Sequence, residues 1–322
     1  MRALVTGAAG FIGSHLCVHL LEQGDEVVGV DALTDTYAPA LKERNLAPAH
    51  RRPAFRLHRA DLLTTGLEAL LDGVDAVYHL AGEPGVRDSW GTRFPTYTER
   101  NVLATQRLLE AARLRDLRAF VFASSSSVYG EARVHPTPET ALPAPVSPYG
   151  VTKLAAEQLC ETYREVFGVP TVSLRLFTVY GPRQRPDMAF ARLVAAAVAG
   201  EPFTLYGDGT QSRDFTHVSD VVAAMRQAAM SEFRGVANVG GGSRTTMRQA
   251  VRVVEQVTGP VELRTVPARP GDARHTTADI RRARASFGYR PRVALDEGLA
   301  DMARAALAGS GPAARPEIGP AA

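Results

Sequence analysis

The stretch YGVTK, residues 149–153, places a tyrosine and a lysine four positions apart. On a helix this spacing puts both side chains on one face. A phenol with a pKa near ~10 is a poor base at neutral pH, and a neighbouring ammonium lowers that pKa by favouring the phenolate. Lys153 is one of only two lysines in an arginine-rich chain, the other being Lys42. A compact ammonium suits ribose hydroxyls better than a guanidinium plane does. The pair therefore predicts a proton-transfer site with Tyr149 as the base and Lys153 as its support.

A phosphate-binding loop is predicted near the start of the chain. The sequence VTGAAGFIGSHL, residues 5–16, places Gly7, Gly10 and Gly13 between a buried strand and a helix. Glycines there allow a tight turn and a close approach of the backbone to a pyrophosphate, and the helix start offers free N–H groups. Asp31 ends the second strand, where a carboxylate accepts hydrogen bonds from ribose hydroxyls and repels a 2′-phosphate. The pattern predicts a dinucleotide site that takes NAD rather than NADP.

Three further stretches follow predicted strands and add polar groups. Asp61 lies in ADL, residues 60–62, and can meet the amino group of adenine. HLAG, residues 79–82, follows the next strand, and the serine run SSSSVYG, residues 124–130, follows another. Parallel sheets bind ligands at the carboxyl edge of their strands. These groups are therefore expected beside the glycine loop.

Short apolar runs alternate with helical patterns through the first half of the chain. Continuous apolar runs are typical of strands buried on both faces, and their alternation with helices predicts an α/β fold with a doubly wound parallel sheet. The predicted strands are residues 2–7, 26–31, 55–60, 75–81, 118–125 and 171–177. The predicted helices are residues 11–24, 66–72, 98–115, 148–168 and 187–199.

This rhythm loosens after residue 177, where proline and glycine become frequent. We therefore predict a dinucleotide-binding domain over residues 1–177, joined by part of 213–240. A second, smaller substrate-binding domain is predicted mainly over residues 178–306. The tail, residues 308–322, is rich in Pro, Gly and Ala and is expected to be flexible.

Composition argues against several other classes of protein. The formal net charge is +3 over 322 residues and the sequence pI is near 9.0, but the arginines are scattered without interleaved aromatic residues. No nucleic-acid partner is therefore expected. Cys17 and Cys160 lie far apart in apolar helical patterns, which indicates buried thiols, a reducing compartment and no metal site. A strand from residue 2 leaves no room for a signal peptide, and no apolar run approaches the ~20 residues of a membrane span. The expected location is cytoplasmic, without membrane contact.

Taken in order, these motifs resemble those of extended short-chain dehydrogenases/reductases, and specifically the NAD-dependent nucleotide-sugar epimerases. The resemblance covers roughly residues 1–306 and includes RLFTVYGPRQRPDMAF at 175–190 and GDGTQSRDFTHVSD at 207–220. It implies a Rossmann NAD domain, a substrate domain and a homodimer formed through two helices. It also implies a mechanism in which Tyr149 takes the proton of the sugar 4-hydroxyl, Ser125 binds the same oxygen, and NAD accepts the C4 hydride. The hydride then returns to the other face of the 4-keto sugar.

The resemblance further assigns residues to NAD and to a UDP-sugar. The residues matched to NAD are Gly7, Gly10, Phe11, Ile12, Gly13, Asp31, Asp61, Leu62, Leu80, Ala81, Gly82, Asn101, Ser124, Tyr149, Lys153 and Val179. The residues matched to the sugar nucleotide are Arg87, Ser125, Ser126, Thr178, Arg185, Met188, Tyr206, Arg213, Arg269 and Asp272. Within these sets Arg213 and Arg269 match positions that clamp the UDP pyrophosphate, and Asn101 is expected to brace the active-site helix.

Related enzymes differ in the residues that follow the catalytic serine. The 4,6-dehydratases carry an acidic pair there and uronate decarboxylases carry Ser–Glu, whereas this chain has Ser126 and Ser127. Dehydration is disfavoured, because eliminating water needs an acid and a base. Decarboxylation is disfavoured less, since a 4-keto uronate loses carbon dioxide with little help. A UDP-glucuronate decarboxylase giving UDP-xylose or the UDP-4-keto-pentose therefore stays open. Intact Ser125, Tyr149 and Lys153 argue against a catalytically dead sugar-nucleotide sensor.

The identity of the sugar is suggested by TVYGPRQRPDM, residues 178–188. Simple UDP-glucose 4-epimerases generally carry Asn in place of Thr178 and lack the Arg-Pro-Asp run, so the stretch resembles UDP-glucuronate 4-epimerases. Arg185 would then bind the C5 carboxylate through paired hydrogen bonds, with Arg87 as a second candidate. We expect conversion of UDP-glucuronate to UDP-galacturonate. The alternative is a UDP-glucose or UDP-N-acetylglucosamine 4-epimerase.

Overall fold

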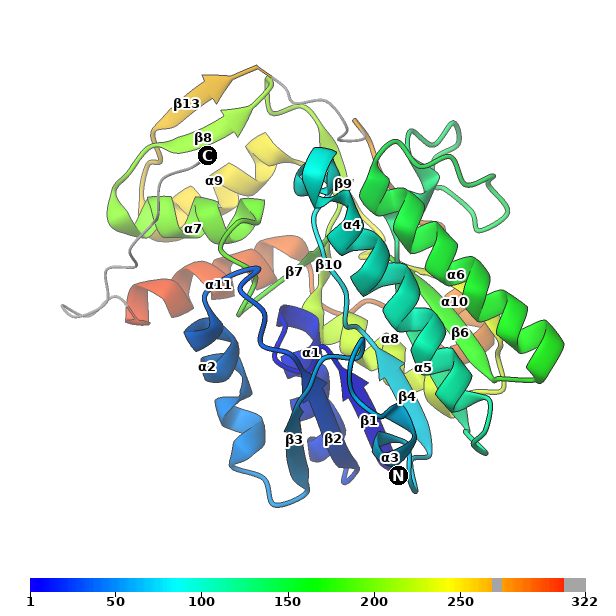
Figure 1. Cartoon of the computed structure of the whole chain (residues 1–322). Coiled ribbons are helices and arrows are strands. Elements are labelled where there is room, and N and C mark those ends of the chain that lie inside the picture. The colour runs from blue at the N-terminus through cyan, green and yellow to red at the C-terminus, as the bar shows by residue number, and fades with distance from the viewer. Residues whose placement is uncertain (268–273, 310–322) are drawn as a thin grey trace.

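A seven-stranded sheet with helices on both faces forms the larger part of the protein, as the computed structural model shows for residues 1–267 and 274–309 (Figure 1). The strand order is β11-β6-β5-β4-β1-β2-β3, and every neighbouring pair is parallel. The strands are β1 (Arg2–Thr6), β2 (Glu26–Asp31), β3 (Phe55–Arg59), β4 (Ala76–His79), β5 (Ala119–Ser125), β6 (Thr171–Leu176) and β11 (Gly235–Val239). The predicted α/β fold with a doubly wound sheet is confirmed. The chain winds from β1 out to β3 and returns to β4, so the switch point lies between β1 and β4.

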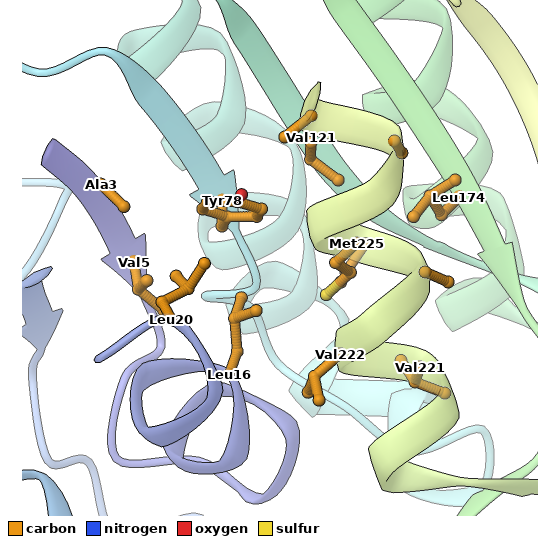
Figure 2. Packing of buried hydrophobic residues seen from close by; sticks show 14 of the residues in the cluster. Ala3, Val5, Leu16, Leu20, Tyr78, Val121, Leu174, Val221, Val222 and Met225 are labelled. Carbon is orange, nitrogen blue, oxygen red and sulfur yellow. The ribbon is translucent and has the colours of Figure 1, made fainter. Parts of the chain in front are cut away.

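Four helices cover one face of this sheet: α1 (Phe11–Glu22), α2 (Pro39–His50), α8 (Val218–Met230) and α10 (Arg281–Phe287). Figure 2 shows Leu16 of α1 and Met225 of α8 packed beside strand residues such as Tyr78. These side chains are almost fully buried. Because both faces of the strands are covered, their apolar runs are continuous rather than alternating.

The opposite face carries α3 (Leu67–Leu70), the π-helical segment η3 (Thr98–Leu103), α5 (Ala104–Ala112) and α6 (Pro148–Phe167). Local signals set the ends of α6. The Ser147 hydroxyl accepts a hydrogen bond from the Gly150 N–H at 3.1 Å, and Pro148 occupies the first turn. Gly168 ends the helix with a φ of 73°, which favours glycine. These signals place Tyr149 in the first turn.

A smaller region with its own core lies beyond the carboxyl ends of the sheet strands (Figure 1). Its helices are α7 (Ala189–Ala199), α9 (Met247–Thr258) and α11 (Leu295–Gly309). Its strands form three pairs: β7 (Val179–Tyr180) with β10 (Thr216–His217), β8 (Phe203–Tyr206) with β13 (Leu263–Val266), and β9 (Ser212–Asp214) with β12 (Arg244–Thr246). The chain returns to the sheet at α8 and β11, and again at α10. The exact division into two domains remains a prediction.

Short elements connect the main ones: η1 (Arg87–Ser89), η2 (Gly91–Arg93), α4 (Phe94–Tyr97) and η4 (Ser126–Tyr129). Most predicted elements agree with the structure to within two residues in length, and three differ more. The helix predicted at 98–115 divides into η3 and α5, and the strand at 75–81 and the helix at 66–72 are shorter than predicted.

Helix α2 was not predicted, because apolar residues do not recur at helical spacing in its sequence, PALKERNLAPAH, and because it contains Pro48. Helix α11 extends to Gly309, two residues into the predicted tail, and the rest of the tail lies outside the described residues. Within the ranges described, no helix has the length and apolar character that crossing a membrane requires.

Candidate active site

The register of the sheet brings distant loops to one edge. Thr6, the last residue of β1, pairs with Val30 of β2 on one side and with His79 of β4 on the other. The residues that follow these strands therefore emerge side by side. A cavity of about 420 Å³ opens at this edge. It is lined by every residue matched to NAD in the sequence, and also by Ser125, Ser126, Thr178, Arg185 and Met188.

The glycine loop has the shape that a bound dinucleotide requires. Gly7 has a φ of +69°, and a Cβ atom on it would lie 2.8 Å from the Ala81 nitrogen. A Cβ atom on Gly13 would lie 2.1 Å from the Gly7 oxygen, so only glycine lets α1 start this close to β1. Helix α1 has no side-chain cap at Gly10, and its first N–H groups are available to a phosphate.

Asp31 is the second element of the predicted NAD site. Its carboxylate is buried and accepts hydrogen bonds from the N–H groups of Ala9 at 2.9 Å and Leu33 at 2.8 Å. These contacts fix the carboxylate beside the glycine loop, at the end of β2. The residues present therefore fit NAD, with phosphates at the loop and a ribose at Asp31.

Ser125 and Tyr149 lie next to one another in the lining of the cavity. Ser125 ends β5, its hydroxyl accepts the Ser127 N–H at 3.1 Å, and it hydrogen-bonds the Tyr149 hydroxyl. The Tyr97 ring packs edge-on against the Tyr149 ring, with centroids 6.3 Å apart. Burial raises the pKa of Tyr149 above its usual value, although the Ser125 hydrogen bond and the positive charge of Arg185 both lower it.

Lys153 lies one helical turn after Tyr149 and also lines the cavity. Burial lowers the pKa of Lys153 to about 8, although Cys160 and the Glu157 carboxylate raise it. Its ammonium lies 4.3 Å from the centroid of the Phe122 ring. The groups of the protein by themselves leave the pKa of Tyr149 raised, because burial outweighs the Ser125 hydrogen bond and the Arg185 charge. When bound, NAD would add the positive charge of its nicotinamide ring, which favours the phenolate as Arg185 does. That Lys153 and the nicotinamide ring together lower this pKa stays a prediction.

A buried ion pair supports the strand and helix that carry these residues. Glu157, on α6, is fully buried and accepts hydrogen bonds from Arg175 of β6, with Arg175 Nη2 at 2.5 Å from Glu157 Oε1. The same carboxylate accepts the Ser124 hydroxyl at 2.6 Å. Arg175 also donates to the Tyr129 hydroxyl at 2.8 Å. The pair thus links α6 to the end of β5, directly beside Ser125.

Asn101 fixes α6 from the other side. Its Nδ2 donates to the Thr152 hydroxyl at 3.0 Å, and its side chain also bonds the backbone of Glu83. This contact with Thr152 braces the active-site helix between Tyr149 and Lys153.

Arg185 lines the cavity but is not free. Its Nε and Nη2 lie 3.0 Å and 2.8 Å from the carboxylate of Asp187, and its side chain is 18% exposed. Burial alone raises the pKa of Asp187, but the hydrogen bond and charge of Arg185 bring it below its usual value. A substrate carboxylate would share this guanidinium with Asp187 or displace it. The sequence did not predict this pair.

Several predicted substrate residues lie away from the cavity lining. Arg87 packs over the Tyr206 ring, with its guanidinium carbon 4.9 Å from the centroid, and so links the loop after β4 to β8. Arg213 donates to the carbonyls of Ser212 and Arg274, both at 3.1 Å. Neither Arg87 nor Arg213 lines the cavity, and their roles toward a substrate stay predictions. Arg269 and Asp272 lie outside the described residues.

The cavity also includes residues that the sequence analysis did not select: Thr34, Thr36, Tyr37, Lys42, Glu83, Arg100 and Ser127. One signal was available, because Lys42 is the only other lysine. Both lysines of the chain line this cavity. The others come from loops without a strong sequence pattern.

A model of the NAD dependent epimerase/dehydratase family matches residues 3–240. The chain belongs to this family. NAD is thus confirmed as its cofactor, and the enzyme is an epimerase-type relative of the short-chain dehydrogenases. The predicted fold is the fold of the family.

Relatives of this enzyme are named for, or were solved with, different UDP-sugars. One relative is the uncharacterized UDP-glucose epimerase YtcB of Bacillus subtilis (strain 168). The two sequences are 45% identical over 93% of this chain and 96% of YtcB. Its structure matches a UDP-glucuronic acid 4-epimerase from Bacillus cereus, crystallised with UDP-glucuronic acid and NAD, with a TM-score of 0.91 and 42% identity over 95% of this chain and 100% of that one. MoeE5, solved with UDP-glucuronic acid and with UDP-glucose, matches with a TM-score of 0.84 and 45% identity over 95% and 100% of the two chains.

Proposed function

We propose that this NAD-dependent nucleotide-sugar 4-epimerase acts on UDP-glucuronate and inverts C4 to give UDP-galacturonate. The observation that carries the proposal is Arg185, a largely buried guanidinium that lines the same cavity as Tyr149. A guanidinium in a water-poor cavity favours a carboxylate, which it binds through paired N–H donors. The likeness to the Bacillus cereus UDP-glucuronic acid 4-epimerase supports the same substrate.

The residues of the cavity have distinct tasks in this reaction. NAD, when bound, supplies the acceptor and donor of the C4 hydride. Tyr149 takes the proton of the sugar 4-hydroxyl and later returns a proton to the same oxygen. Ser125 donates a hydrogen bond to that oxygen and holds it near Tyr149. Lys153 donates hydrogen bonds to ribose hydroxyls. Its amine carries a positive charge at pH values below its lowered pKa.

A neutral sugar is the second candidate, and the Arg185–Asp187 pair favours it. Because Asp187 already neutralises Arg185, the charge available to a uronate is smaller than that of a free guanidinium. The relatives named as a UDP-glucose epimerase or solved with UDP-glucose support this candidate as well. Dehydration and decarboxylation are less favoured, because Ser126 and Ser127 provide no carboxyl group next to Ser125.

The test compares two substrates and two arginine variants. The wild-type protein, which we expect to purify with NAD bound, is given UDP-glucuronate or UDP-glucose, and the products are read by proton NMR. Arg185→Ala should lower turnover of UDP-glucuronate at least ~10-fold more than turnover of UDP-glucose, since a desolvated charge pair contributes over 1.4 kcal/mol.

Arg183→Ala is the matched control. Arg183 lies in the same loop but hydrogen-bonds Ser14 rather than lining the cavity. It should therefore affect both sugars alike. A wild type that prefers UDP-glucose, or an Arg185→Ala variant that slows both sugars equally, would make the neutral-sugar epimerase the better assignment.

We also propose that the enzyme forms a homodimer through α5 and α6. The surfaces of these helices and their ends carry exposed apolar side chains, namely Leu103, Leu114, Val151, Val166 and Phe167. Exposed apolar groups gathered on neighbouring helices favour association. Light scattering after size-exclusion chromatography should give twice the mass of 34.5 kDa, and a monomer at micromolar concentration would rule the proposal out.

A further inference from the structure

Glu83 is a buried carboxylate to which no step of the reaction has been assigned. It follows β4, it is 2% exposed, and it lines the NAD cavity. Its Oε2 lies 2.5 Å from Arg100 Nη1, and its Oε1 lies 3.2 Å from Arg93 Nη2. The Thr36 hydroxyl lies 3.3 Å from Oε2 and 3.5 Å from Oε1. A single carboxylate therefore contacts three segments, and those of Thr36 and Arg100 border the cavity.

Consecutive residues of η3 hold Glu83 at its backbone and at its side chain. Asn101 Oδ1 accepts the Glu83 N–H at 2.7 Å, and Asn101 Nδ2 donates to the Glu83 carbonyl at 3.0 Å. Arg100, the preceding residue, binds the carboxylate. Neighbouring residues of an α-helix point in different directions. In the π-helical segment η3, however, the neighbours Arg100 and Asn101 both contact Glu83. Such π-helical turns are frequent at functional sites. Glu83 is therefore rigidly fixed on the β4 side of the cavity.

The partner on the β2 side is fixed as well. Thr36 lies in the loop between β2 and α2, and its hydroxyl is 3.2 Å from that of Thr34. Lys42 Nζ donates to the Thr34 carbonyl at 2.7 Å and to the Thr34 hydroxyl at 3.1 Å. A continuous chain of hydrogen bonds thus runs from Lys42 on α2 to Arg100 on η3, through Thr34, Thr36 and Glu83.

The sheet topology shows which strand this series of hydrogen bonds crosses. Strands β2 and β4 are the two neighbours of β1 in the sheet, so a link between the loops that follow them spans the carboxyl end of β1. The glycine loop lies at that end, and Thr34, Thr36, Glu83 and Arg100 line the same cavity. The two guanidiniums more than offset the single negative charge of Glu83, so that the carboxylate does not repel a pyrophosphate.

We propose that Glu83 is a positioning residue for the cofactor: through Thr36, Arg93 and Arg100 it ties the loop after β2 to the loop after β4 across the glycine loop, and this tie slows the release of NAD. For NAD to leave, the two loops must separate and the Thr36–Glu83 contact must break. Retention matters to an epimerase, because the hydride taken from the sugar must be returned before the cofactor dissociates.

The experiment measures NAD exchange rather than turnover. Purified protein that carries NAD is mixed with a large excess of isotopically labelled NAD, and the labelled fraction of bound cofactor is followed by mass spectrometry after rapid gel filtration. Thr36→Val removes one link at constant shape and should speed the exchange about 3- to 10-fold, the effect of one net hydrogen bond. Glu83→Gln weakens all three links and should speed it further.

Thr98→Val is the matched control. The exposed Thr98 hydroxyl donates to the carbonyl of Phe94 in the preceding helix α4, and this hydrogen bond is not part of the tie. Its exchange rate should equal that of the wild type. The proposal is overturned if Thr36→Val and Glu83→Gln both exchange NAD within 2-fold of the wild-type rate. It is also overturned if only Glu83→Gln is faster and its melting temperature falls while Thr36→Val is unchanged, because Glu83 would then serve only the fold.

Discussion

Replacing Arg175 with methionine should leave the Glu157 carboxylate buried without its ion-pair partner. Arg175 reaches Glu157 through Nε at 3.2 and 3.0 Å and through Nη2 at 2.5 Å, and both side chains are buried. Methionine fills a similar volume but donates no hydrogen bond. Of the side-chain donors to Glu157 in the described part of the chain, only the Ser124 hydroxyl would then remain. Breaking one side of a buried pair costs about 3–5 kcal/mol of the free energy of unfolding.

The loss should have two further signatures, one in stability and one in turnover. The double variant Arg175→Met with Glu157→Gln should recover part of the loss, because two neutral groups cost less to bury than one unpaired charge. The end of β5 beside Ser125 depends on the same pair, and turnover should fall in both variants.

Urea unfolding followed by circular dichroism gives the free energies for the wild type, the two single variants and the double variant. The matched control is Arg164→Met, since Arg164 pairs with Glu161 and Glu165 on the partly exposed side of α6. That change should cost less than about 1 kcal/mol. If Arg175→Met costs no more than the control, or if the double variant loses the sum of the single effects, the buried pair is not the support that its geometry indicates.

Two other outcomes are expected. Tyr149→Phe should slow turnover at least ~100-fold, because it removes the base, while NAD measured after denaturation should remain; near-normal turnover would contradict the assigned base. The fully buried Asp214 has its pKa raised by burial to about 6, although hydrogen bonds from the Ala278 and Gly241 N–H groups lower it. Since folding then favours the protonated form, stability relative to Asp214→Asn should fall by up to ~3 kcal/mol as pH rises from 4 to 6.5, and a flat difference in urea unfolding would refute this.

Local patterns determined the elements of this protein. Apolar runs such as that of β5 must be buried on both faces, which requires a parallel sheet covered by helices. The glycine loop after β1 could be identified from the sequence, because glycine is favoured at the positive φ of Gly7 and only glycine permits the close contact at Gly13. The spacing of Tyr149 and Lys153 was readable because a helix fixes which neighbours share a face. Motifs confined to one turn or one strand end were therefore assigned from the sequence.

Contacts between segments were decided by the tertiary structure. The pairing of Thr36 with Glu83 depends on β2 and β4 flanking β1, which no local pattern encodes. Arg185 was readable as a cation, but its partner Asp187 and the burial around Tyr149 set what that charge does. A side chain's type follows from the sequence, whereas its partners and its pKa depend on which distant groups the packed chain brings within a few ångströms and how much water it excludes.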